Sequence, residues 1–210
     1  MDRLWFIAAL LAVWVGFRLA LRPALALLFG EEIGKRALAR VPERVSLSRR
    51  GDDAWKDPDQ ARRRWEPLLA HGFVDAGTFG VNEMPGVVMR LLASPADSIL
   101  AVAYEHPRVG QWLELTTYYT DGHRVSATNQ WATGMDSPPF VTVLRAAGVS
   151  SLKMLDLVRH KRPAGMMVPL TPADVARRFE LGYADAMAWR RGTPITTREV
   201  VKVAVNRRAA

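Results

Sequence analysis

QWLELTTYYTDGHRVSATN, residues 111–129, is the stretch of this chain with the clearest structural signal. Residues 111–119 and 124–129 contain many residue types that favour β-strands. Between them lies Asp121-Gly122, a dipeptide typical of two-residue hairpin turns, because these turns need the positive φ that glycine adopts easily. The stretch therefore predicts a β-hairpin.

Further strands are predicted on the N-terminal side of this hairpin. Residues 73–82, 87–93 and 99–105 are β-rich, and Ser94-Pro95-Ala96-Asp97 has the composition of a turn. Short links between closely spaced strands are typical of antiparallel pairing. We expect an antiparallel meander of four or five strands. Residues 130–148 are expected to be irregular, because Pro138-Pro139 excludes a central strand nearby.

Helices are predicted on both sides of the meander. Asp57-Pro58 should start a helix that ends at Gly72, and Pro67 inside it should either kink the helix or shift its true start. A short helix is expected from Ser151, and an amphipathic one behind residues 171–174. Thr196 and Glu199 form a possible capping box for a last segment that suits a helix or a strand.

The first thirty residues predict a membrane anchor. Residues 4–29 taken as one helix would be about 39 Å long, enough to cross a bilayer with tilt. Arg18 and Arg22 would share one face and reach the lipid phosphates. A signal peptide cleaved after Ala24-Leu25-Ala26 and a buried core helix are the alternatives. The expected fold class is thus α+β: an N-terminal transmembrane helix, then the meander packed with C-terminal amphipathic helices.

The distribution of Lys and Arg predicts the topology. Basic residues are far more frequent after the apolar segment than before it, and such residues mark the cytoplasmic side. The prediction is a single-pass protein of the bacterial inner membrane with a cytoplasmic C-terminal domain. The expected divisions are an anchor at 1–30, a juxtamembrane basic linker at 31–56 and a single α+β domain at 57–210.

Composition limits the chemistry. The 210 residues carry a net charge of +8 and contain no cysteine, which excludes disulfides and cysteine-ligated zinc. This net positive charge favours anionic partners. Hydrophobic residues make up 49% of the chain, enough to form a hydrophobic core. Besides the juxtamembrane region, basic residues cluster at 62–64 and 159–162; contact with an anionic membrane surface and simple solvation are equally open interpretations of these clusters.

No catalytic or cofactor motif is evident. The four histidines, His71, His106, His123 and His160, lack metal-ligand spacing. Ser150-x-x-Lys153 lacks the apolar setting that would activate its lysine. The carboxylates Glu105, Glu114 and Asp121 are interpreted as ordinary residues of exposed strands and turns. We expect no cofactor and no metal.

The aromatic residues of the predicted sheet leave two interpretations open. Trp112, Tyr118, Tyr119 and Trp131 lie near arginines, as on a platform for single-stranded nucleic acid. Rings on strands are more often core residues or cross-strand pairs. A nucleic-acid partner is not expected.

These features together predict a non-catalytic accessory subunit that docks on a larger bacterial membrane complex. Membrane lipids with anionic head groups and other membrane-protein subunits would be its partners. The expected contact residues are Arg18, Arg22, Lys35, Arg36 and Arg40. The alternative is a membrane-tethered domain that binds a lipid or other amphiphile in a cavity of its curved sheet. An enzyme of unidentified class is the third hypothesis.

Overall fold

The computed structural model describes residues 29–131 and 135–206. Its contacts divide the chain into two compact units. We call residues 42–131 and 137–189 the sheet unit. The other, the terminal unit, takes its described residues from 29–41, 135–136 and 190–206.

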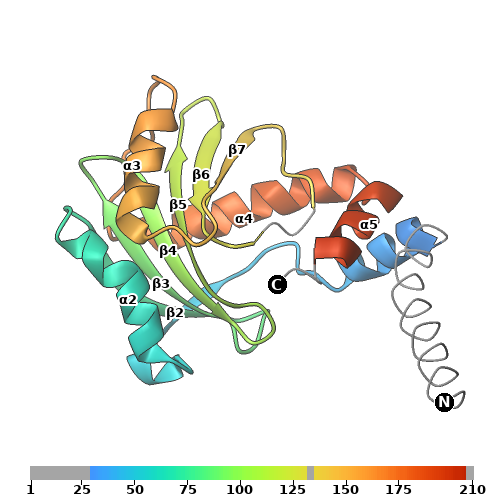
Figure 1. Cartoon of the computed structure of the whole chain (residues 1–210), viewed down its shortest axis with the longest axis horizontal. Coiled ribbons are helices and arrows are strands. Elements are labelled where there is room, and N and C mark those ends of the chain that lie inside the picture. The colour runs from blue at the N-terminus through green and yellow to red at the C-terminus, as the bar shows by residue number, and fades with distance from the viewer. Residues whose placement is uncertain (1–28, 132–134, 207–210) are drawn as a thin grey trace, which may run out of the picture. The chain divides into compact units, whose positions relative to one another are not determined.

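A seven-stranded sheet forms the centre of the sheet unit, and its strands lie in the order of the sequence. Figure 1 shows most of the strands side by side. Neighbouring strands are antiparallel from β1 to β6, and β7 pairs with β6 in parallel. The strands are β1 (Leu47–Arg50), β2 (Val74–Val81), β3 (Val88–Ser94), β4 (Ile99–His106), β5 (Gly110–Tyr118), β6 (Arg124–Thr128) and β7 (Val141–Arg145).

The loop between β5 and β6 differs from the predicted two-residue turn. The Tyr119 amide donates to the His123 carbonyl at 2.9 Å, so three residues, Thr120 to Gly122, form the loop. Gly122 supplies the positive φ, at +88°. The Asp121 carboxylate accepts a hydrogen bond from the His123 amide at 2.9 Å and closes the turn. Asp-Gly therefore marked the hairpin correctly but not its loop length.

Both edge strands were missed, and the expected count of four or five strands is wrong. β1 lies in the range predicted as a linker, and it ends in the exposed pair Arg49-Arg50. β7 begins two residues after Pro138-Pro139. An edge strand pairs on one side only, so it tolerates charge and nearby prolines that a central strand would exclude.

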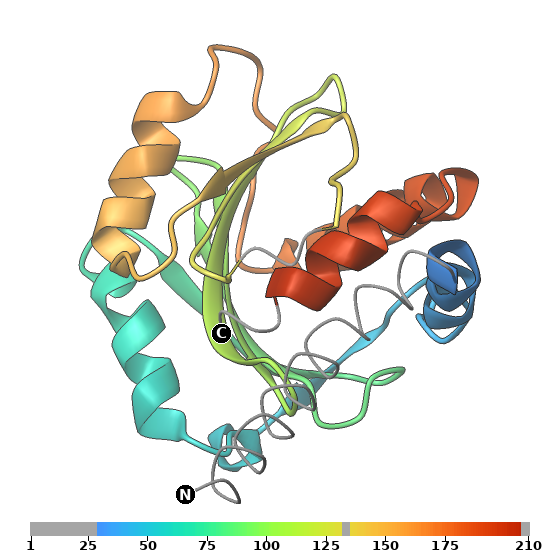
Figure 2. The same cartoon turned by 45° about the vertical axis from the view of Figure 1, so that its right-hand side comes forward.

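Helices α2 (Pro58–Leu69) and α3 (Ser151–Lys161) lie on one face of the sheet, as Figure 2 shows. They cover a core of fully buried side chains that includes Leu68, Leu113 and Leu155. The start of α2 is as predicted, because the Asp57 carboxylate accepts a hydrogen bond from the Gln60 amide at 2.9 Å. A short 3-10 helix, η1 (Asp52–Ala54), precedes it.

Helix α4 (Val175–Gly192) lies on the opposite face of the sheet. Val175 is fully buried in a second core with Leu91, Leu100 and Val102, and Phe179 packs against it. The sheet thus has an apolar core on each face. The predicted amphipathic helix behind residues 171–174 corresponds to α4.

The terminal unit contains helical backbone at residues 29–39 and helix α5 (Thr197–Asn206). The capping box exists: the Thr196 amide donates to the Glu199 carboxylate at 2.9 Å, and the Glu199 amide donates to the Thr196 hydroxyl at 3.2 Å. It settles the last segment as a helix. Glu199 also forms an ion pair with Arg190 at 3.0 Å.

The predicted fold class and location need correction. Across residues 29–131 and 135–206, no helix is long and apolar enough to cross a membrane, because charged residues interrupt each one, as Glu31, Glu32, Lys35 and Arg36 do in the first. This finding contradicts both the fold that opens with a transmembrane helix and the single-pass placement in an inner membrane. The anchor segment itself, apart from residues 29 and 30, lies outside the described residues. The described fold is mixed α+β, with seven strands and five α-helices.

Candidate functional site

A cavity of about 360 Å³ lies between the sheet and helix α4, within the sheet unit. We call it the α4 cavity. Its floor comes from the face of β3 to β6 that points away from α2 and α3. Phe179, Gly182, Tyr183 and Ala186 contribute the helix wall. The volume falls within the range of small-molecule sites, about 300–1,000 Å³.

Most of the cavity wall is apolar. Met89, Leu100 and Val102 line it from β3 and β4. Tyr104 and Trp112, cross-strand neighbours on β4 and β5, form a flat aromatic surface, with ring centroids 4.5 Å apart and planes 13° from parallel. An apolar molecular body would find suitable contacts here.

A cluster of polar side chains, Glu114, Thr116 and Ser126, interrupts the apolar wall. The Ser126 hydroxyl donates to Glu114 Oε1 at 2.5 Å, and the hydroxyls of Thr116 and Ser126 lie 2.8 Å apart. No described residue donates a hydrogen bond to the other carboxylate oxygen, Oε2. Glu114 therefore offers the cavity an acceptor that the protein does not use.

Two phenol groups, those of Tyr104 and Tyr118, also line the cavity. Burial, and after it the charge of Glu114, raises the pKa of Tyr104 well above its ordinary value. Burial also raises the pKa of Tyr118, although the charge of Arg124 opposes it. Both groups therefore stay protonated at neutral pH and can donate hydrogen bonds.

Arg124 on β6 links the strands that form the floor of the α4 cavity to helix α4. Its side chain is 9% exposed, and its two terminal nitrogens donate to the Gly182 carbonyl at 2.6 Å and to the Asp185 carboxylate at 2.9 Å. The guanidinium also lies over the rings of Tyr118 and Phe140, 5.5 and 5.0 Å from their centroids. With both terminal nitrogens engaged, Arg124 holds α4 in position.

The contact residues expected from the sequence lie elsewhere. Arg18 and Arg22 are outside the described residues. Lys35, Arg36 and Arg40 are exposed on or just after the helix at residues 29–39. Arg36 pairs with Glu32 at 2.7 Å, one helical turn away. Their roles toward lipids and other subunits stay predictions.

Sequence reasoning missed the polar cluster because Glu114 was interpreted as an exposed strand residue. Strand β5 is covered on both faces, so the alternation of polar and apolar residues along it does not distinguish positions that face the core from positions that face solvent. One signal was available: polar Glu114 and Thr116 alternate with buried Leu113 and Leu115. The described residues contain no group of three or more His, Asp or Glu that could hold a metal ion.

No family model, no curated protein and no solved structure matches this chain.

Proposed function

We propose that this protein binds a small amphiphile in the α4 cavity. The observation that carries the proposal is the free Glu114 carboxylate oxygen inside a largely apolar cavity of about 360 Å³. Ligand sites of this kind combine an apolar wall with a few fixed polar groups that orient the ligand. The docking function predicted from the sequence stays a prediction, since no described residue tests it.

The polar groups indicate the kind of ligand end. The Glu114 side chain accepts hydrogen bonds from Ser126 and Thr116, so its remaining oxygen favours a ligand group that donates one. A hydroxyl or an amine meets this condition. Tyr104 and Tyr118 also line the cavity, and their protonated phenol groups are further hydrogen-bond donors. The apolar body would lie against Met89, Leu100 and the Tyr104–Trp112 pair.

The test is a cavity-filling substitution with a matched control on the same helix. Ala186 lines the cavity, whereas Ala188 is exposed. The full-length wild-type chain and the variants Ala186→Phe and Ala188→Phe would be titrated with N-phenyl-1-naphthylamine, a fluorescent amine with an apolar body. We expect saturable binding by the wild type and by Ala188→Phe. Ala186→Phe should weaken binding by about tenfold or more, because the added ring occupies ligand space.

Circular dichroism and thermal unfolding of each variant would establish that Ala186→Phe is folded. Displacement of the probe by 1-decanol would show that an unrelated amphiphile uses the same site. The proposal is refuted if the wild type gives no saturable signal, or if folded Ala186→Phe binds the probe as tightly as Ala188→Phe does.

A further inference from the structure

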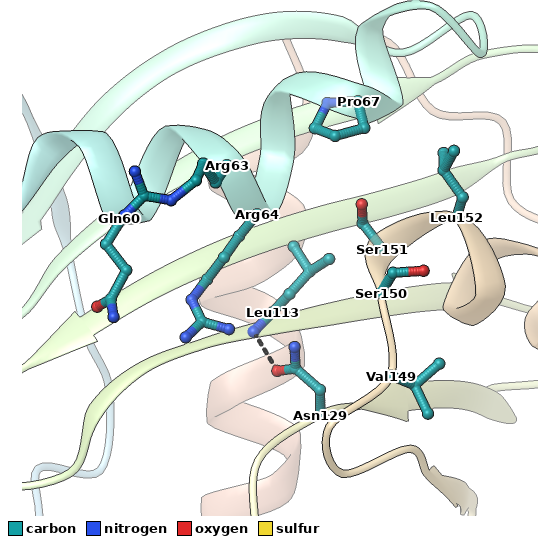
Figure 3. Close-up of a pocket in the computed structure, with 10 residues that line it drawn as sticks. All are labelled: Gln60, Arg63, Arg64, Pro67, Leu113, Asn129, Val149, Ser150, Ser151 and Leu152. Atoms are coloured by element: carbon teal, nitrogen blue, oxygen red, sulfur yellow. Dashed lines mark hydrogen bonds between the residues drawn. The ribbon is translucent and has the colours of Figure 1, made fainter.

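A second cavity, of about 340 Å³, opens between α2 and α3 on the other face of the sheet. Figure 3 shows the ten residues that line it, and we call it the α2–α3 cleft. No Asp or Glu is among these ten residues, whereas two of them, Arg63 and Arg64, carry a positive charge. The charge that faces this cleft is therefore of one sign.

Arg64 is the central feature of the cleft. Figure 3 shows its guanidinium directed from α2 toward Leu113 and Asn129. No described residue accepts a hydrogen bond from this guanidinium, and its Nε is shielded from solvent. Burial, and after it the charge of Arg63, lowers the pKa of Arg64 below its ordinary value. A shielded donor without an acceptor costs free energy, which an anion in the cleft would recover.

The opposite wall supplies further donors. The Asn129 side-chain oxygen accepts from the Leu113 amide at 2.7 Å, which leaves the NH2 group of Asn129 to donate elsewhere. Ser150, at the start of α3, makes no side-chain capping hydrogen bond, so its hydroxyl is available. The N–H groups of the first turn of α3 add to these donors.

From these donors we infer that the α2–α3 cleft binds a phosphate monoester with a small apolar body. A phosphoryl group presents several oxygens in different directions, so it can accept from the arginines of α2 and from the Ser150 side of the cleft together. Pro67, Leu113, Val149 and Leu152 complete the wall with apolar surface, and the volume exceeds what a bare phosphate fills. This site does not depend on the α4 cavity.

Calorimetric titration of the full-length chain with phenyl phosphate tests the inference. Benzoate serves as the comparison ligand, because it has the same ring and a flat carboxylate with a single charge. At physiological salt we expect one saturable phenyl phosphate site per chain and at least about tenfold weaker binding of benzoate. Absence of a saturable site, or benzoate binding as tight as that of phenyl phosphate, overturns the inference.

The arginine run offers a matched control. Arg62 is exposed and does not line the cleft, so Arg62→Gln removes the same charge from the same helix as Arg64→Gln. We expect Arg64→Gln to weaken phenyl phosphate binding by about tenfold or more and Arg62→Gln to change it by less than about twofold. Equal losses of affinity in the two variants would mean that the positive charge of α2 as a whole attracts the ligand, and would refute a specific site in the cleft.

A second variant protects the test against a folding defect in Arg64→Gln. Ser150→Asp keeps a residue that caps helices well and places a carboxylate in the cleft. The variant should retain the thermal unfolding midpoint of the wild type or exceed it, while phenyl phosphate binding falls by about tenfold or more. Unchanged binding by Ser150→Asp would contradict the proposed site.

Discussion

Two ion pairs of the terminal unit show how burial determines what a charged residue contributes to stability. Glu32 and Arg36 lie 2.7 Å apart with both side chains more than half exposed. Glu199 and Arg190 lie 3.0 Å apart and are nearly buried, at 2% and 9% exposure. Glu199 also accepts hydrogen bonds from the amides of Asp136 and Thr196. Its removal would leave buried donors and the Arg190 charge without their shared acceptor.

We expect Glu199→Ala to destabilise α5 by about 3 kcal/mol, because it breaks a buried ion pair and a capping box together. Glu32→Ala, the matched exposed change, should cost less than about 1 kcal/mol. Native-state hydrogen exchange of the α5 amides measures the free energy of local opening in each variant. Similar small losses for both substitutions would show that the buried pair contributes no more than the surface pair.

Among the elements, those with partners on both sides were predictable, and those at the edges were not. The strands β2 to β6 were expected within a residue or two of their bounds, because β-rich runs alternate there with turn residues. β1 has only four residues, and two of them are arginines. Its hydrogen bonds come from β2, so its own sequence carries little of the information that makes it a strand.

Helix α4 depends on a glycine for its close approach to the sheet. A Cβ at Gly182 would lie 2.8 Å from the Tyr118 hydroxyl and 3.1 Å from Arg124 Nη1. Gly182→Ala should therefore lower the free energy of unfolding by about 1–3 kcal/mol, although alanine favours a helix by about 1 kcal/mol.

Urea unfolding of the full-length chain measures this effect. Gly192→Ala is the control, because nothing lies within 4 Å of a Cβ at the last residue of the same helix. That change should be neutral or stabilising. A stabilised Gly182→Ala variant would show that α4 can move away from the sheet at little cost.

For the whole molecule, the net charge could be predicted from the sequence, but the candidate site could not. The α4 cavity forms where Glu114 on β5, Ser126 on β6 and Ala186 on α4 face one another. Their proximity depends on sheet register and helix placement, which no local pattern contains. The predicted contact residues came from charge alone, and exposed Lys35, Arg36 and Arg40 carry no distinctive geometry.

Stability at acid pH is a property of the whole chain that the structure predicts. Burial acts to raise the pKa of Asp97, but hydrogen bonding and charge from Arg159, with the charge of Arg162, outweigh it, so the net pKa is lowered. A carboxylate with a lowered folded-state pKa stabilises the fold above its unfolded pKa of about 3.9, and this stabilisation is lost as the pH falls through the folded value. The pKa of Glu199 is lowered as well, where hydrogen bonds and Arg190 outweigh burial.

The unfolding temperature should therefore stay nearly constant from neutral pH to about pH 5 and fall below about pH 4. Asp97→Asn should lower it at neutral pH and converge with the wild type at the acid end, where both lack the charge. Thermal unfolding across a pH series measures this, with the exposed residue Asp156, changed to Asn, as the control. A constant offset between Asp97→Asn and the wild type down to the lowest pH would refute this account.

The sequential order of the strands has a consequence for how the chain acquires its structure. Each strand from β1 to β6 finds its neighbour one link further along the chain, so the loops that must close to form the sheet are mostly short. Helix α4 follows all seven strands and packs on residues as distant as Leu91 and Leu100. The sheet can therefore assemble hairpin by hairpin as the polypeptide lengthens, while the cavity under α4 is closed only at the end. We therefore expect substitutions at the contacts between α4 and the sheet to change the rate of unfolding more than the rate of folding.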